Sequence, residues 1–145
     1  MILWLRNQFL CQANYPANIK AVVDRLVGGF NKKDHALYNS AFAGDAIVVD
    51  GIAPYRWTGS NAQARWLFDA EKWLHNFGVE SENLVCDKVV HGSVVGTYAY
   101  VVISATLFLK LKGGETTSRP GLLTLTFAKQ DDEWKVGSQT WGRLS

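Results

Sequence analysis

The chain has 145 residues, of which 48% are hydrophobic and 19% charged, so it can build one apolar core and is not expected to be disordered. A formal net charge of +2, with no basic stripe interleaved with aromatic residues, argues against nucleic-acid binding. Neither Cys11 nor Cys86 has neighbours at metal-ligand spacing, so we expect a reduced, cytoplasmic protein without a metal site. A disulfide between these two cysteines is the less favoured alternative.

The first sixteen residues form an apolar extension that begins MILWLRNQFL. Its basic residue, Arg6, follows the apolar run, and no small-residue cleavage site comes after it, so the segment does not resemble a signal peptide. The run is also too short to cross a bilayer, and we expect no membrane partner. We expect residues 1–16 to pack on the domain formed by residues 17–145, or on a second copy of it.

Three helices are predicted next. Apolar residues recur at helical spacing over residues 17–30, and Asp34 is placed to cap a short second helix. Ser60 and Gln63 have the spacing of a capping box at the start of a third helix, which Gly78 would end.

Two groups of β segments are predicted. A short β segment, 46–50, lies between the second and third helices with a second one at 55–58. After Gly78 come four segments rich in β-branched and aromatic residues: 83–91, 97–112, 115–129 and 133–141. Turn residues separate them at 91–96, 113–114 and 130–132, which predicts an antiparallel meander.

The predicted architecture is α+β, with a curved, cone-shaped antiparallel sheet of about five to six strands wrapped around three N-terminal helices. The segment 97–112 would rise about 50 Å if it were straight. In a chain of this size such a strand must bend, which gives the sheet a concave side. Three helices cover that side only in part, so we expect an internal apolar pocket.

Several strings in this order resemble the nuclear transport factor 2-like superfamily, which includes ketosteroid isomerases and SnoaL-like polyketide cyclases. Residues 21–25 (AVVDR) resemble the first helix of the isomerases, and 42–50 (FAGDAIVVD) resemble the passage into the first strand. Trp57-Thr58-Gly59 is similar to the common W-x-G lead-in to the third helix, and 131–136 (DDEWKV) followed by Trp141 resemble the closing strand. The resemblance covers roughly residues 19–144. It implies a homodimer formed through the outer face of the sheet.

Asp50 is the candidate catalytic residue. It ends the first predicted strand, and Gly59 follows nine positions later, an interval that resembles the isomerases. In that family the aspartate at this place is the general base. A carboxylate beside Phe30, Phe42 and Trp66 would be desolvated, which raises its pKa toward a value useful for proton transfer. The alternative is that the Asp-Gly pair only turns the chain after a strand.

The isomerase mechanism also needs hydrogen-bond donors for the developing enolate. The family places a tyrosine in the first helix and an acid on a strand, whereas this chain has Leu26 at the first position and no acid around Leu122 and Leu123. Steroid isomerisation by that route is therefore not expected. No Arg-x-Asp string occurs in the sheet region, which argues against the limonene epoxide hydrolase arrangement as well.

Apolar side chains from the three helices and the β segment 55–58 are expected to line the pocket. They are Leu26, Phe30, Phe42, Trp57 and Trp66. Ordinary core packing is the alternative for most of them. Ser138 and Thr140 share a face of the last strand, where they could donate hydrogen bonds to a ligand or equally face solvent.

Two further residues could carry chemistry. Arg119 could bind a carboxylate or an enolate, but the adjacent Pro120 and Gly121 favour a strand edge with an exposed side chain. His91 is predicted in a turn beside Gly92, where a solvated role is favoured over that of a base.

The sequence therefore favours a pocket protein that binds a small apolar ligand. One hypothesis is a cofactor-independent enzyme of the isomerase, cyclase or lyase type, with Asp50 as acid–base group on an apolar ring or ketone substrate. The alternative is a non-catalytic ligand-binding or dimerisation module. A third hypothesis is a subunit that assists a larger enzyme.

Overall fold

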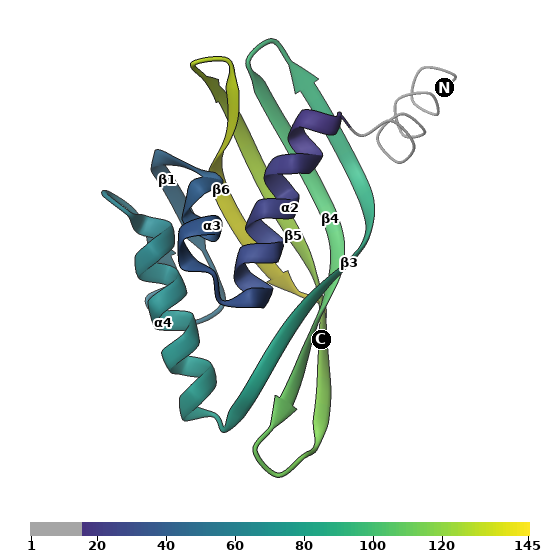
Figure 1. The fold of residues 1–145 in the computed structure, drawn as a ribbon. Helices are drawn as coiled ribbons and strands as arrows, with labels where there is room; N and C mark the ends of the chain where they lie inside the picture. Colours follow the sequence, from purple (N-terminus) through teal and green to yellow (C-terminus); the bar gives the residue numbers. More distant parts are fainter. Residues whose placement is uncertain (1–15) are drawn as a thin grey trace.

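A computed structural model describes residues 16–145 of the chain (Figure 1). The elements follow the order α2–α3–β1–β2–α4–β3–β4–β5–β6 and build a single sheet with helices on it, which confirms the predicted α+β class. The predicted packing of the N-terminal extension and any disulfide of Cys11 lie outside the described residues. Among the described residues, no helix combines the length and the apolar character needed to span a bilayer.

The first two helices form as predicted. Helix α2 (Ala17–Lys32) buries the apolar stripe that its sequence periodicity indicates. Helix α3 (His35–Ser40) is capped by the Asp34 side chain, which accepts a hydrogen bond from the Leu37 backbone N–H at 3.0 Å. The two helices pack closely because Gly29 of α2 has no side chain to separate it from the backbone of Tyr38.

The predicted capping box at Ser60 is wrong. Helix α4 (Ala62–Asn76) has Asn61 as its N-cap, with a left-handed backbone (φ 56°) and no capping hydrogen bond from its side chain. The Arg65 side chain instead donates to the backbone oxygens of Thr58 and Ser60. Gln63 is buried in the core and does not turn back toward the helix start.

One six-stranded sheet runs in the order β2-β1-β6-β5-β4-β3. Its strands are β1 (Phe42–Val49), β2 (Arg56–Trp57), β3 (Val79–Val95), β4 (Tyr98–Leu111), β5 (Thr116–Gln130) and β6 (Glu133–Arg143). Strands β3 to β6 form the predicted antiparallel meander. The first turn of the meander lies at Gly96 and Thr97, so His91 is inside strand β3 and pairs with Val102, not in a turn.

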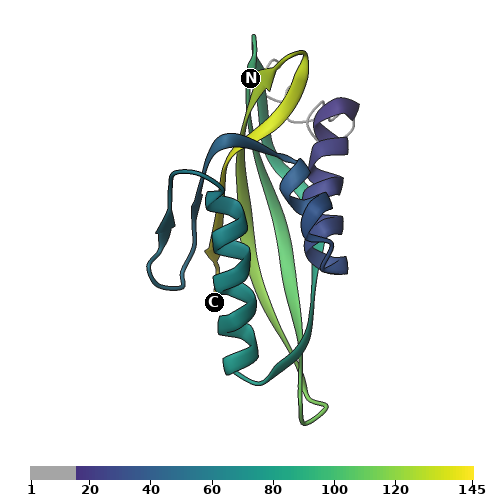
Figure 2. The same cartoon turned by 60° about the vertical axis from the view of Figure 1, so that its left-hand side comes forward.

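Strand β1 pairs with β2, as expected for two neighbouring β segments, but its pairing with β6 was not predicted. Strands β1 and β6 are parallel in an otherwise antiparallel sheet. Register shifts interrupt the ladders between β3 and β4 and between β5 and β6. Such bulges bend and twist a strand, which explains how strands this long curve around the helices. In Figures 1 and 2 the helices α2, α3 and α4 lie on one side of the sheet, and the β4–β5 hairpin extends past the end of α4.

Candidate functional site

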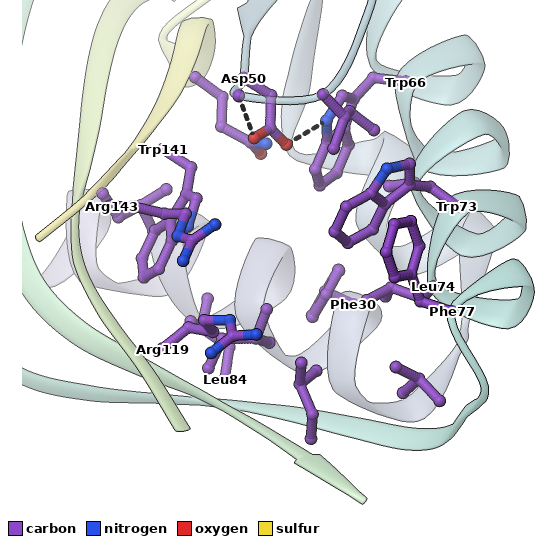
Figure 3. A pocket seen from close by; sticks show the side chains of 18 of the residues that line it. Phe30, Asp50, Trp66, Trp73, Leu74, Phe77, Leu84, Arg119, Trp141 and Arg143 are labelled. Atoms are coloured by element: carbon purple, nitrogen blue, oxygen red, sulfur yellow. Dashed lines mark hydrogen bonds between the residues drawn. The ribbon is translucent and has the colours of Figure 1, made fainter. Parts of the chain in front are cut away.

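A cavity of about 360 Å³ lies between the helices and the concave face of the sheet (Figure 3). All three helices contribute to its walls, together with strands β3 to β6 and the segment that follows β1. Most of the lining is apolar. The charged side chains in it are one carboxylate, Asp50, and two guanidinium groups, Arg119 and Arg143.

Strand alternation places Asp50 at the edge of the core. Ala46 and Val48 point inward and are fully buried, whereas Val49 is exposed, so the next inward position is Asp50. Strand β1 ends just before this residue, and the Asp50 backbone N–H donates to the Tyr55 oxygen at 3.1 Å across the following turn. The turn fixes the aspartate at the end of the strand with its side chain in the cavity wall.

Two hydrogen bonds orient the carboxylate of Asp50. The indole Nε1 of Trp66, on α4, donates to Oδ2 at 2.7 Å, and the Gly51 backbone N–H donates to Oδ1 at 2.5 Å (Figure 3). Burial raises the pKa of Asp50 above its ordinary value, while these two hydrogen bonds act in the opposite direction. The balance keeps the pKa raised, because the loss of hydration outweighs the two donors.

A buried polar pair lies in the same wall. The hydroxyl of Tyr38 donates to Oε1 of Gln139 at 2.8 Å, and both side chains line the cavity. Burial raises the pKa of Tyr38 well above its ordinary value, and the negative charge of Asp50 raises it further. Tyr38 therefore stays a protonated donor at neutral pH, and its bond to the Gln139 oxygen leaves the amide N–H groups of Gln139 available for a ligand.

Aromatic rings form the side of the cavity near the C-terminal end of α4. Trp73 and Phe77 contact each other with ring centroids 4.4 Å apart. They are 40% and 66% exposed, so they lie where the cavity meets solvent. Phe30 of α2 stacks on Trp66 deeper inside, with centroids 6.3 Å apart. These rings offer flat apolar surfaces to a ligand.

Of the pocket residues predicted from sequence, four line the cavity: Leu26, Phe30, Asp50 and Trp66. Phe42 and Trp57 are buried but lie outside the lining. Phe42 packs on the ring of Tyr38. Trp57 lies on strand β2, where it pairs with the buried Val48, and its indole donates to Asp69 at 2.8 Å. Both side chains are occupied in the core, which corrects their predicted place in the pocket.

Ser138 and Thr140 also lie outside the lining, and a bulge in β6 explains the correction. Thr126 pairs with Ser138 but the next residue, Phe127, pairs with Val136, so one extra residue sits in β6. The bulge reverses the alternation and turns Gln139 inward. The Ser138 hydroxyl is engaged with that of Thr126 at 2.5 Å on the other face.

Sequence reasoning missed Gln139, Trp141 and Arg143, and it favoured an exposed position for Arg119. The signal that was available is Gly137, since a glycine inside a strand often marks a bulge. Counting the alternation from that glycine would have placed residues 139, 141 and 143 on the concave face. His91 is outside the cavity and contacts the edge of the Tyr100 ring.

Within residues 16–145, no three His, Cys, Asp or Glu side chains gather where they could hold a metal ion. The chemistry that the lining itself offers is proton transfer at Asp50, hydrogen bonding at Gln139 and anion binding at the two arginines.

No protein-family model matches the sequence, and no curated protein matches it significantly. Solved structures do match. Hexachlorocyclohexane dehydrochlorinase LinA-type3 from Novosphingobium barchaimii aligns with a TM-score of 0.73 and 14% identity, over 89% of this chain and 86% of that chain. An NTF2-like protein with a cystatin-like fold from Novosphingobium aromaticivorans gives 0.72 and 17%, over 89% and 81%. An NTF2-like superfamily protein from Salmonella enterica gives 0.71 and 14%, over 88% and 89%. At these identities the similarity establishes the fold alone.

Proposed function

We propose that this chain, which has the nuclear transport factor 2-like fold, is a cofactor-independent enzyme that moves a proton on a small apolar substrate. Asp50 is the acid–base group. The observation that carries the proposal is the Asp50 carboxylate in the cavity wall, oriented by Trp66 and held at a raised pKa by burial. A carboxylate whose pKa moves toward neutrality is a better base than an exposed one.

The reaction begins when Asp50 takes a proton from a substrate carbon. The electron pair of that C–H bond then forms a C=C bond. Either a leaving group departs from the adjacent carbon with its bonding pair, or the π pair of an adjacent carbonyl moves to its oxygen and gives an enolate. The proton on Asp50 then leaves with the departing group or returns to the enolate, which restores the carboxylate. In the second case the amide of Gln139 is available to donate to the developing oxyanion. This donor replaces those that the sequence lacks at Leu26 and Leu123.

Solved structures with a similar fold support this class of reaction. The dehydrochlorinases are named for the loss of hydrogen chloride from a chlorinated ring, which is an elimination of the first kind. The apolar cavity of this chain has a size typical of small-molecule sites. We therefore assign the substrate to ring compounds or ketones with an acidic C–H bond.

Hydrogen–deuterium exchange into 2-tetralone, an apolar bicyclic ketone, tests the proposal. In D₂O the protein is expected to accelerate exchange at the carbon beside the carbonyl, as followed by NMR. Asp50→Asn is expected to lower the rate by about a hundredfold or more, the usual contribution of a general base. The control is Asp45→Asn, an exposed aspartate of the same strand, which should leave the rate unchanged.

A non-catalytic ligand-binding protein is the second candidate. It is favoured by the hydrogen bonds that already engage both oxygens of Asp50. For that protein, 2-tetralone would bind but exchange no faster than in buffer, and Asp50→Asn would change nothing. This result would exclude Asp50 as a base.

A further inference from the structure

Two guanidinium groups lie on the same side of the cavity. Arg143 of β6 is paired with Gly121 of β5, and Arg119 lies two residues before Gly121 on the same face. Their side chains are therefore diagonal neighbours on two adjacent strands. Figure 3 shows both groups directed toward the middle of the cavity, with Asp50 on another side of it.

In the part of the chain that the structure describes, no Asp or Glu side chain forms an ion pair with Arg119 or Arg143. Arg143 is exposed at the rim of the cavity, and its Nε and Nη2 atoms donate to the main-chain oxygen of Ser145 at 3.1 and 2.8 Å. Arg119 is partly buried, and a partly buried cation without an anionic partner favours a ligand that brings one.

Trp141 provides a flat apolar surface next to these two arginines. A Cβ atom added at Gly121 would lie 2.5 Å from Cζ2 of Trp141, so the indole lies directly over the glycine. The absence of a side chain at Gly121 thus lets an aromatic ring cover the strand between Arg119 and Arg143. On the α4 side of the cavity, Trp73 and Phe77 offer a second aromatic surface.

We propose that the ligand of this cavity is a carboxylic acid with a flat apolar body. Its carboxylate is bound by Arg119 and Arg143, whose planar guanidinium groups match the two oxygens of a carboxylate. Its body lies against Trp141 and the Trp73–Phe77 pair, and its reactive carbon reaches Asp50. This inference rests on the proposed binding of a small molecule in the cavity and names the chemical class of that molecule.

Charge balance favours an acid over a neutral or basic ligand. The lining carries two cationic side chains and one carboxylate whose raised pKa disfavours its charged form. A monoanionic ligand therefore brings the occupied cavity close to neutrality, whereas a basic ligand would add a third cation. The anionic end is also held on a different side of the cavity from Asp50, which limits repulsion between the two carboxylates (Figure 3).

The test compares 2-naphthoate with 2-naphthamide, its neutral isostere, by titration calorimetry at neutral pH and low salt. The wild-type protein is expected to bind the acid about tenfold or more tightly than the amide, because hydrogen bonds to charged groups are stronger than neutral ones. Arg119→Gln and Arg143→Gln should each reduce this ratio, and the double variant should bring it near one without weakening amide binding. Arg56→Gln, an exposed arginine of β2 outside the lining, is the control and should keep the wild-type ratio.

Circular dichroism checks that each variant folds. Where a glutamine variant does not fold, Arg119→Lys or Arg143→Lys replaces it. The lysine variants keep the charge but lose the planar fork, so they should give an intermediate ratio. Equal binding of acid and amide by the wild type overturns the proposal, as does an unchanged ratio in the double variant. Either result leaves the role of Asp50 standing, because ketone exchange measures that role separately. If Asp50→Asn loses ketone exchange while the wild type shows no preference for the acid, the role of Asp50 stands and the carboxylic acid proposal fails.

Discussion

Asp50 occupies a place that stabilises its neutral form, although two donors hold its carboxylate. Burial raises its pKa, and the hydrogen bonds from Trp66 and Gly51 only partly offset that effect. In this environment the ionised side chain lowers the free energy of unfolding, which it would not do at a more exposed position. Proteins often accept such a cost at functional sites, where a group must be reactive as well as stable.

This cost predicts how stability depends on pH. Because the pKa of Asp50 is higher in the folded protein than in the unfolded chain, its favourable contribution is complete below the unfolded value of about 3.9 and is lost as pH rises through the folded value. The asparagine in Asp50→Asn cannot ionise. The free energy of unfolding of the variant, minus that of the wild type, should therefore increase as pH rises from 3 to 7. Urea unfolding at several pH values measures the difference.

The control for this measurement is Asp45→Asn, since Asp45 is exposed on the same strand. The stability difference between this variant and the wild type should not grow with pH in the same way. A difference for Asp50→Asn that falls with rising pH would mean that the hydrogen bonds from Trp66 and Gly51 outweigh burial. The folded pKa would then lie below the unfolded one.

At the scale of elements, the contact between α2 and α3 depends on one glycine. A Cβ atom on Gly29 would lie 2.4 Å from the backbone nitrogen of Tyr38. Gly29→Ala should therefore push α3 away from α2, displace the Tyr38 ring in the cavity wall and cost about 1–3 kcal/mol of stability. Thermal or urea unfolding measures the loss.

The neighbouring residue Gly28 is a matched control in the same helix. Its added Cβ would only reach ordinary contact with Leu37, at 4.0 Å. Alanine is a better helix former than glycine by up to about 1 kcal/mol, so Gly28→Ala should leave the protein equally stable or more stable. Equal effects of the two substitutions would show that α2 and α3 move apart without cost.

The elements that the sequence predicted well are those whose signal is local. Periodicity over residues 17–30 and turn residues such as Gly114 and Asp131 depend only on near neighbours in the chain. The parallel pairing of β1 with β6 joins distant segments and leaves no local trace. The bulge at Gly137 was not predicted either, and so the inward position of Gln139 was missed.

The candidate site was therefore only partly predictable. Trp66 was found because it lies on the apolar stripe of a helix with clear periodicity, and Asp50 because it ends a short β segment at an interval from Gly59 that resembles the isomerases. Arg119 was considered, but an exposed strand edge was favoured for it, because its place depends on how far β5 extends. Arg143 was missed, because its place depends on the reversed face of β6. Features of this kind arise from the whole sheet and not from a window of sequence.

At the scale of the whole molecule, the two faces of the sheet differ. The concave face packs on the helices and holds the cavity. On the opposite face of β4, alternate residues leave Tyr98, Tyr100 and Phe108 exposed at 68%, 43% and 47%. Exposed aromatic residues that share one face often mark a contact with another protein.

We expect this outer face to pair with a second copy of the chain, as the family resemblance implies. Sedimentation at micromolar concentration should then show a dimer. Tyr100→Glu and Phe108→Glu should shift it to monomer, because each places a charge in an apolar contact. Phe68→Glu is the matched control: Phe68 is 68% exposed on α4, outside the sheet, so its substitution should leave the dimer intact. A wild-type protein that sediments as a monomer at all concentrations would contradict the pairing and leave the cavity proposals unaffected, since all lining residues named above come from one chain.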